Sequence, residues 1–272
     1  MARSFPQVLI SAALAGFVAA GCSASSGRPA GARLASNSLG STSAPAVHRR
    51  LLLGYSVEHR PIGAQELGDP TAGIRVLVVG CIHGNERAGI SVARRLETTS
   101  APQGVDLWVI DDLNPDGAAA DTRQNAHRVD LNRNFPYGWL AAGRPGDQQY
   151  PGPRPLSEPE ARIAYRLVLR LRPQITIYFH QPLGLVDESG GDPRVERRFA
   201  ALSGLPLLRL TRYPGSAVGW QNHRLPHTTA FVVELPSSNL TSPSAARLAR
   251  AVLTLAGEQP SREGRSTRPP RR

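Results

Sequence analysis

The sequence predicts an α/β protein with a single domain, built on a mixed, mainly parallel twisted sheet that has helices on both faces. Short apolar runs bounded by turn residues recur along the chain, among them Val76–Val79, Val105–Ile110 and Ile175–Phe179. Segments with apolar residues at helical spacing separate these runs, and strands that alternate with helices are typical of parallel sheets. Roughly 210 residues take part, a length that suits one domain with a sizeable core.

The amino-terminal segment, residues 1–22, has the layout of a secretory signal. Arg3 precedes an apolar run, Val8–Ala20, that ends in small residues and is too short for a membrane span. Gly21-Cys22-Ser23 resembles a bacterial lipobox. We therefore expect an exported lipoprotein of the cell envelope, anchored to the membrane by a lipid on Cys22, with a plain signal peptide cleaved nearby as the alternative.

Segments of loop-like composition border the domain on both sides. Residues 23–48 are rich in Ser, Gly, Ala and Pro and are expected to be a flexible tether, because this composition cannot bury enough surface to offset its ordering entropy. Residues 258–272 predict a disordered basic tail. The folded domain is therefore expected to span residues 49–257.

The chain carries a formal net charge of +11 and contains no lysine. The flanking segments supply much of the excess, and no recognisable nucleic-acid-binding motif accompanies it. An exported basic chain is instead expected to touch anionic cell-wall polymer or lipid headgroups. The sequence indicates no nucleic-acid partner and no obligate protein partner.

The domain is expected to open with a β-hairpin, Leu51–Val57 and Ile62–Leu67, whose strands are joined by a polar turn. Val76–Val79 then forms a buried strand, after which Gly80 lets the backbone turn. Arg87–Thr98 has apolar residues at helical spacing and is predicted to be a helix.

His83 and Glu86 stand between this strand and this helix, where α/β folds usually place their sites. Imidazole and carboxylate are both good Zn²⁺ ligands, and a catalytic zinc takes three protein ligands and leaves one position for water. The structural alternative is a polar loop histidine and a first-turn glutamate that interacts with the helix dipole. Nearby Cys81 is expected to be a small buried residue that closes the strand.

A long polar loop follows the predicted strand Val105–Ile110. Asn114-Pro115 and Asp116-Gly117 are turn dipeptides, so the strand is expected to end here in an elaborate loop. Residues 122–136 are dense in polar side chains and contain three arginines with almost no apolar spacing. They indicate a binding surface, and a solvated loop whose asparagines cap its own turns is the structural alternative.

A helix is predicted over residues 158–171. Ser157 as its N-cap and Glu160 three residues later form the pattern of a capping box. The apolar strand Ile175–Phe179 follows and ends in His180.

His180 supplies the missing ligand. Parallel neighbouring strands would bring its imidazole and that of His83 to the same edge of the sheet. Together with Glu86, the two histidines would hold one Zn²⁺ ion and leave a position open for water.

The last predicted strand, Ala230–Pro236, is apolar except for Glu234. An unpaired glutamate in such a strand costs several kcal/mol unless something compensates it. A salt bridge to a nearby arginine is the structural alternative, and a general base above the metal is the functional one. A helix over Ser242–Leu255 is expected to close the domain.

Five short motifs occur in order along the domain: His83-Gly84-Asn85-Glu86, Asn114-Pro115-Asp116-Gly117, Asp130-Leu131-Asn132-Arg133-Asn134-Phe135-Pro136, Phe179-His180 and Phe231-Val232-Val233-Glu234-Leu235-Pro236. Over residues 50–257 the chain resembles the zinc metallocarboxypeptidases. It is most similar to their bacterial murein peptide amidase branch, which cuts the γ-D-glutamyl bond to meso-diaminopimelate in cell-wall peptides. This resemblance implies a carboxypeptidase-like fold and one Zn²⁺ ion held by His83, Glu86 and His180.

The resemblance also implies the roles of other side chains. Glu234 looks like the general base and subsequent acid, and Arg123 like the arginine that polarises the scissile carbonyl. Asn132 and Arg133 look like the pair that holds the terminal carboxylate of the substrate. Tyr213 lies in the region of the mobile tyrosine of related enzymes, although its Tyr-Pro-Gly-Ser context departs from the digestive enzymes.

The expected function is that of a zinc amidase or carboxypeptidase acting on cell-wall peptides outside the membrane. The alternatives are a general metallocarboxypeptidase, a deacylase of N-acyl amino acids of the aspartoacylase type, and a non-catalytic wall-binding lipoprotein. The sequence leaves open whether the scissile bond is α- or γ-linked and what the 181–229 segment selects. The histidines outside the motifs are expected at the surface: His48, His59, His127, His223 and His227.

Overall fold

The computed structural model describes residues 46–260. The predicted signal segment with Cys22, most of the tether and nearly all of the basic tail lie outside the described residues. Within the described range, no helix is long and apolar enough to span a bilayer.

The domain is organised around an 8-stranded sheet in the order β1-β2-β4-β3-β5-β8-β6-β7. The strands are β1 (Val47–Tyr55), β2 (Pro61–Gly68), β3 (Ile74–Val79), β4 (Val105–Ile110), β5 (Ile175–His180), β6 (Leu183–Asp187), β7 (Leu207–Leu208) and β8 (Thr229–Pro236). The neighbours β4, β3, β5 and β8 run parallel. The antiparallel ribbon β1–β2 extends one side, and β6 pairs antiparallel with β8 on the other.

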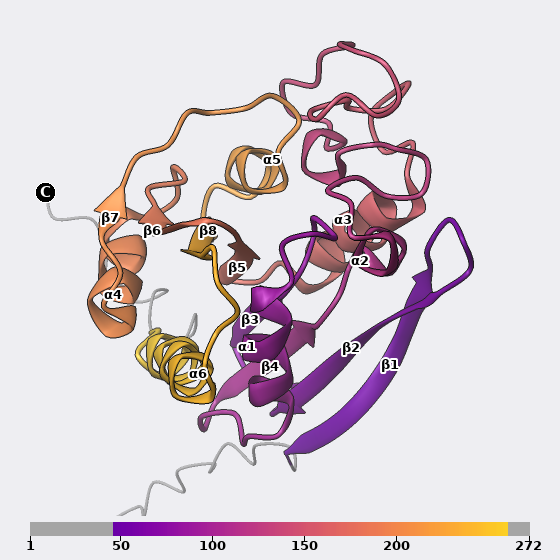
Figure 1. Ribbon diagram of the computed structural model, residues 1–272. Helices are drawn as coiled ribbons and strands as arrows, with labels where there is room; N and C mark the ends of the chain where they lie inside the picture. The colour runs from indigo at the N-terminus through magenta and orange to yellow at the C-terminus, as the bar shows by residue number, and fades with distance from the viewer. Residues whose placement is uncertain (1–45, 261–272) are drawn as a thin grey trace, which may run out of the picture. The chain divides into compact units, whose positions relative to one another are not determined.

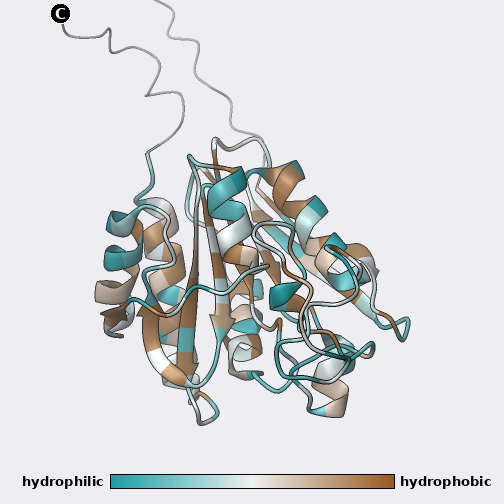
Figure 2. Ribbon diagram, turned by 90° about the horizontal axis from the view of Figure 1, so that it is seen from above, coloured by the Kyte–Doolittle hydropathy of each residue, from teal (hydrophilic) through white to brown (hydrophobic). Residues whose placement is uncertain are grey.

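Helices cover both faces of this sheet (Figure 1). Helices α1 (Ala88–Glu97), α4 (Pro193–Ser203) and α6 (Ser242–Gly257) pack on one face, and α3 (Pro159–Leu171) and α5 (Ala217–Arg224) pack on the other. Figure 2 shows the hydrophobic residues concentrated on the strands that run between the helices.

Alternating side chains of the buried strands feed two separate apolar clusters. In β3, for example, Val76 and Val78 join the cluster under α1 and α6, whereas Leu77 and Val79 join the cluster under α3. A strand buried on both faces reads as a continuous apolar run, which is why these strands could be found in the sequence. The predicted mixed, mainly parallel sheet with helices on both faces is therefore confirmed.

The predicted capping box at the start of α3 is wrong. The helix begins at Pro159, and the residue before it is Glu158, which makes no side-chain capping bond. The Glu160 carboxylate instead accepts hydrogen bonds from the Val57 amide and from Asn125 Nδ2, each at 3.0 Å. It is fully buried and ties the end of β1 to the long polar loop.

Two further stretches differ from the prediction. The loop after β4 contains a short helix, α2 (Pro115–Ala120), capped by Asn114, whose side-chain oxygen accepts from the Gly117 amide at 3.0 Å. A 3₁₀ turn, η1 (Leu131–Arg133), follows farther along this loop. The 181–229 segment, for which no elements were predicted, forms β6, α4, β7 and α5.

Candidate active site

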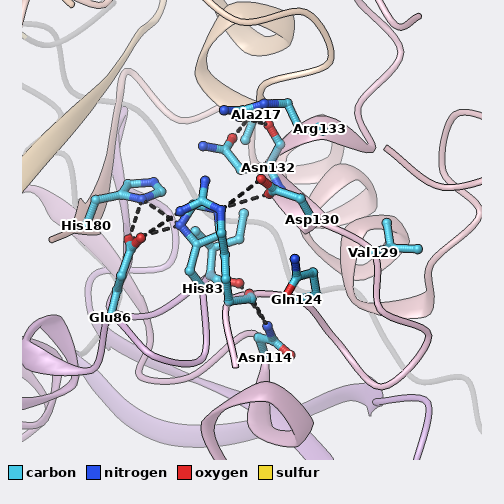
Figure 3. Close-up of polar contacts among 12 residues, drawn as sticks. His83, Glu86, Asn114, Gln124, Val129, Asp130, Asn132, Arg133, His180 and Ala217 are labelled. Atoms are coloured by element: carbon cyan, nitrogen blue, oxygen red, sulfur yellow. Dashed lines mark hydrogen bonds and ion pairs between the residues drawn. The ribbon is translucent and has the colours of Figure 1, made fainter. Parts of the chain in front are cut away.

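The predicted metal ligands meet at the carboxyl ends of two neighbouring parallel strands. His83 and Glu86 lie in the turn that joins β3 to α1, and His180 is the last residue of β5. Their side chains point toward one another (Figure 3). The turn packs closely against α2, because a Cβ atom on Gly84 would lie 1.9 Å from the carbonyl carbon of Gly117. Only glycine fits at this position.

Three ligand atoms converge in this group. Oε2 of Glu86 lies 2.9 Å from Nδ1 of His83 and 2.9 Å from Nδ1 of His180, and the two nitrogens are 3.1 Å apart. Ligands placed tetrahedrally around Zn²⁺ at its usual bond lengths are separated by about 3.3 Å. The three atoms therefore fit the edges of a zinc coordination shell.

The protonation states of Glu86 and His180 also suit a cation. Burial lowers the pKa of His180, which leaves its imidazole neutral. Burial opposes ionisation of Glu86, yet the two histidines hold its pKa below the usual range, so the group is a carboxylate. Two imidazole nitrogens that face each other across 3.1 Å cannot both carry a proton without repulsion. A metal ion relieves this conflict, because it binds the lone pairs of both.

Asp130 orients His83 from the side opposite Glu86. Its Oδ1 accepts from Nε2 of His83 at 3.0 Å, which directs the Nδ1 lone pair toward the metal position. Burial opposes ionisation of Asp130, but the charges of His83 and Arg123 hold its pKa below the usual range. Asp130 opens the motif Asp130–Pro136, but no role was predicted for it. Its position two residues before Asn132 was the available signal.

Arg123 connects the two carboxylates of the centre. Its Nη1 donates to Oε1 of Glu86 at 2.8 Å and its Nε to Oδ2 of Asp130 at 3.0 Å. Asn114 holds the backbone beneath it, because its Nδ2 donates to the carbonyl oxygens of Ile82 and Arg123. Asn114, which belongs to one of the turn dipeptides of the sequence, therefore holds the backbone next to His83 and the backbone of Arg123 together.

Arg133 is a buried guanidinium without a carboxylate partner among residues 46–260. Only 6% of the residue is exposed, its Nη1 donates to the carbonyl of Asn132 at 2.8 Å, and its Nε has no partner in this part of the chain. The ring of Tyr213 stacks 4.3 Å from its central carbon. Burial lowers the pKa of Arg133. Arginine nevertheless keeps its charge in proteins. An anion is therefore the partner that this group lacks.

Asn132 is divided between structure and site. Its Oδ1 accepts from the Ala217 amide at the start of α5, at 2.9 Å, so that its Nδ2 is the group left for a ligand. The 3₁₀ turn η1 carries both Asn132 and Arg133, and this fixes their relative positions.

Glu234 lies on β8 directly beside His180 of β5. Burial, and then the charge of Glu86, raise the pKa of Glu234 to about 7. Its Oε2 is buried without a hydrogen-bond partner, and no arginine within residues 46–260 forms an ion pair with it. The structural alternative was a compensating salt bridge, and the described residues form none with Glu234.

A single cavity of about 150 Å³ brings all the candidate residues together. Its lining includes every predicted site residue: His83, Glu86, Arg123, Asn132, Arg133, His180, Tyr213 and Glu234. Asp187, Ser189 and Arg212 line another part of the wall. They belong to the 181–229 segment, for which no elements were predicted. Cys81 is buried outside this lining, and the five histidines expected at the surface are exposed.

Comparison with known proteins gives a consistent set of similarities. The model of a family described as zinc carboxypeptidase matches residues 40–182. Murein peptide amidase A of Escherichia coli (strain K12) is 32% identical over 160 residues, which cover 53% of this chain and 64% of that protein. The chain thus matches slightly less than two thirds of that relative's length. Murein peptide amidase A of Vibrio campbellii is 32% identical over 182 residues, 61% of this chain and 72% of that protein.

Solved structures show the same relationship. The murein-tripeptide amidase of Escherichia coli O157 has a TM-score of 0.61 at 26% identity and covers 78% of this chain and 92% of its own. Carboxypeptidase A of Helicoverpa armigera has a TM-score of 0.66 at 15% identity, with coverage of 78% of this chain and 68% of its own, and this likeness concerns the fold.

Proposed function

Because the chain belongs to the zinc carboxypeptidase family and is a hydrolase of that type, we propose that it releases meso-diaminopimelate from murein peptides by cutting the γ-D-glutamyl bond. The observation that carries the proposal is Arg133, a buried guanidinium without an anion, in the cavity that also holds the metal ligands and Glu234. A site of this kind requires a free carboxylate next to the bond that it cuts. The murein substrate is supported by the relatives named murein peptide amidase A.

Family membership implies Zn²⁺, and His83, Glu86 and His180 are the residues that would hold it. When bound, the ion supplies a Lewis acid that polarises the scissile carbonyl. The rest of the chemistry is assigned to side chains of the chain itself.

Glu234 is proposed as the general base and then the general acid. With a pKa of about 7, the carboxyl group can accept a proton from the attacking water and return it to the leaving amine at neutral pH. Its unpartnered Oε2 leaves the group free to do so.

Two arginines are proposed to act on different groups of the substrate. Arg123 is locked by Glu86 and Asp130 through Nη1 and Nε, so its Nη2 is the donor left to stabilise the oxygen of the scissile carbonyl. Arg133, together with Nδ2 of Asn132, binds the terminal carboxylate. Tyr213 stacks on Arg133 and is proposed to close over that carboxylate.

The proposed location follows the substrate. Murein lies outside the cytoplasmic membrane, which agrees with the signal-like residues 1–22. Anchoring through a lipid on Cys22 is part of the same proposal, and so is action without a nucleic-acid or obligate protein partner.

The test is mass spectrometry of the products formed from L-Ala-γ-D-Glu-meso-diaminopimelate by the purified protein, with and without a zinc chelator. We expect free diaminopimelate, and none after chelation. Glu234→Gln should retain zinc, measured by elemental analysis, and lose turnover. Glu188→Gln is the matched control, because Glu188 directly follows the neighbouring strand β6 and does not line the cavity.

Other results would favour the alternatives. Full turnover by Glu234→Gln contradicts the assigned base. Release of ordinary carboxyl-terminal residues without diaminopimelate indicates a general metallocarboxypeptidase, and cleavage restricted to small N-acyl amino acids indicates a deacylase. Binding of the tripeptide without hydrolysis by the zinc-loaded protein indicates a wall-binding protein.

A further inference from the structure

An ion pair between Asp187 and Arg212 lies in the part of the cavity wall formed by β6 and the loop before α5. Asp187 is the last residue of β6, and Arg212 belongs to that loop. Nη1 of Arg212 donates to Oδ2 of Asp187 at 2.8 Å. The two partners differ in exposure, because the Asp187 side chain is 4% exposed and that of Arg212 is 42% exposed. The carboxylate is therefore the fixed member of the pair, and the guanidinium is the accessible one.

Asp187 already accepts three hydrogen bonds from the protein. Its Oδ1 accepts from the Leu210 amide at 2.8 Å, and its Oδ2 accepts from the Ser189 hydroxyl at 2.7 Å as well as from Arg212. These bonds fix the carboxylate in one orientation. Asp187 is thus held in place to position Arg212.

Arg212 keeps most of its donors. A guanidinium has five N–H groups, and within residues 46–260 the structure records one hydrogen bond from this side chain, the bond to Asp187. The remaining donors belong to a side chain that lines the same cavity as the metal ligands. A planar group with free parallel donors is suited to a carboxylate, which it can bind through two hydrogen bonds.

Three arginines line the cavity, and two of them already have assignments. Arg123 is held by two carboxylates, and Arg133 is assigned to the terminal carboxylate of the substrate. We propose that Arg212, positioned by Asp187, binds a second carboxylate, carried on the side chain of the residue that the enzyme releases. This inference rests on the proposed function, and it identifies the residue that selects diaminopimelate from among amino acids with other side chains.

The substrate chemistry offers a matched pair for testing this assignment. Lysine has the side chain of diaminopimelate without the distal carboxylate, so that two tripeptides, L-Ala-γ-D-Glu-meso-diaminopimelate and L-Ala-γ-D-Glu-L-lysine, differ by that one group. A side chain that reads the distal carboxylate must affect one tripeptide and leave the other unchanged. A side chain that only ties the loop to β6 must affect both equally.

The experiment measures kcat/KM for both tripeptides with the zinc-loaded wild type and Arg212→Gln. We expect a loss of about 10- to 100-fold on the diaminopimelate peptide, the effect of one charged hydrogen-bonding group, and little change on the lysine peptide. Arg212→Lys should retain part of the selectivity because it keeps the charge. Arg209→Gln is the control, since Arg209 is exposed in the same part of the chain and does not line the cavity.

Asp187→Asn tests the positioning role. The amide oxygen can still accept from the Leu210 amide, so the loop keeps an anchor while the charge that fixes Arg212 is lost. Selectivity for the diaminopimelate peptide should fall, and kcat on the lysine peptide should stay near the wild-type value. Equal losses on both peptides, in this variant and in Arg212→Gln, would overturn the proposal in favour of a structural pair.

Binding measurements separate this proposal from the proposed function. Calorimetric titration of the zinc-loaded protein with free meso-diaminopimelate and free lysine needs no turnover. Weaker binding of diaminopimelate alone to Arg212→Gln supports the subsite even if neither tripeptide is cut, a result that would refute only the murein reaction. Unchanged binding and unchanged kcat/KM ratios refute the subsite and leave the reaction standing.

Discussion

Replacing Asp130 with asparagine tests the support of the metal centre without touching a ligand. Asp130 is fully buried and accepts three hydrogen bonds, from His83 Nε2 at 3.0 Å, from Arg123 Nε at 3.0 Å and from the Asn132 amide at 2.9 Å. In Asp130→Asn, the amide oxygen can replace Oδ1 toward His83 and Asn132. The amide NH₂ group then faces the Nε–H of Arg123, so that two donors oppose each other.

The magnitude follows from what is lost. One charged hydrogen bond contributes about 1.5–3 kcal/mol, so the free energy of unfolding of the metal-free protein should fall by about that amount. Loss of the carboxylate behind a metal-binding histidine typically weakens metal affinity by about 10- to 100-fold. We therefore expect a variant that folds and binds zinc more weakly by one to two orders of magnitude, a range that competition with a chelator of known affinity can measure.

The pH dependence gives an internal check. The pKa of Asp130 is held below its usual value in the folded protein, so the ionised group stabilises the fold above about pH 4, and this stabilisation is lost as the pH falls further. The difference in unfolding free energy between Asp130→Asn and wild type should accordingly shrink in acid. Asp121→Asn is the control, since Asp121 is exposed and pairs with Arg87 at the surface. Wild-type zinc affinity in Asp130→Asn would refute the assigned role.

Two further predictions concern other buried charges. Arg133→Met should raise KM for the tripeptide about tenfold or more and abolish discrimination against its carboxyl-terminal amide. The metal-free protein should become no less stable, because the substitution removes a guanidinium that is buried without an anion. Unchanged discrimination would contradict this prediction. Burial raises the pKa of Glu196 to about 7, so the folded state prefers the protonated group, and the stability that it contributes at low pH is lost as the pH rises from about 4.5 to 7. Glu196→Gln should match the wild type near pH 4 in denaturant unfolding and exceed it by up to about 3 kcal/mol at pH 8, whereas a constant difference across this range would show that Glu196 does not titrate as stated.

The sequence predicted the elements whose side chains follow one simple rule. Buried parallel strands read as apolar runs, so Val76–Val79 and Val105–Ile110 were placed within two residues of β3 and β4. The same rule placed His83 and His180 at strand ends, and parallel neighbours necessarily bring such ends together. The ligand set was therefore accessible from local pattern and topology.

Long-range hydrogen bonds could not be predicted from local sequence patterns. Glu160 has the spacing of a capping residue, yet its carboxylate binds the Val57 amide, 103 positions away in the chain. Asp130 and Asp187 are both buried acids whose roles depend on partners that only the fold supplies. Spacing along the chain carries no information about such partners, so the support of the metal centre was not predicted, and Asp187 and Arg212 could not be placed.

The place of β8 in the sheet brings together residues that lie far apart along the chain. This strand is the last one within residues 46–260, yet it lies between β5 and β6, which precede it. A chain that ends before Thr229 would contain all three metal ligands and lack Glu234, the proposed base. The pairing of β8 with β5 and β6 places Glu234 beside His180. The proposed base therefore joins the metal ligands only when the segment that begins at Thr229 pairs with β5.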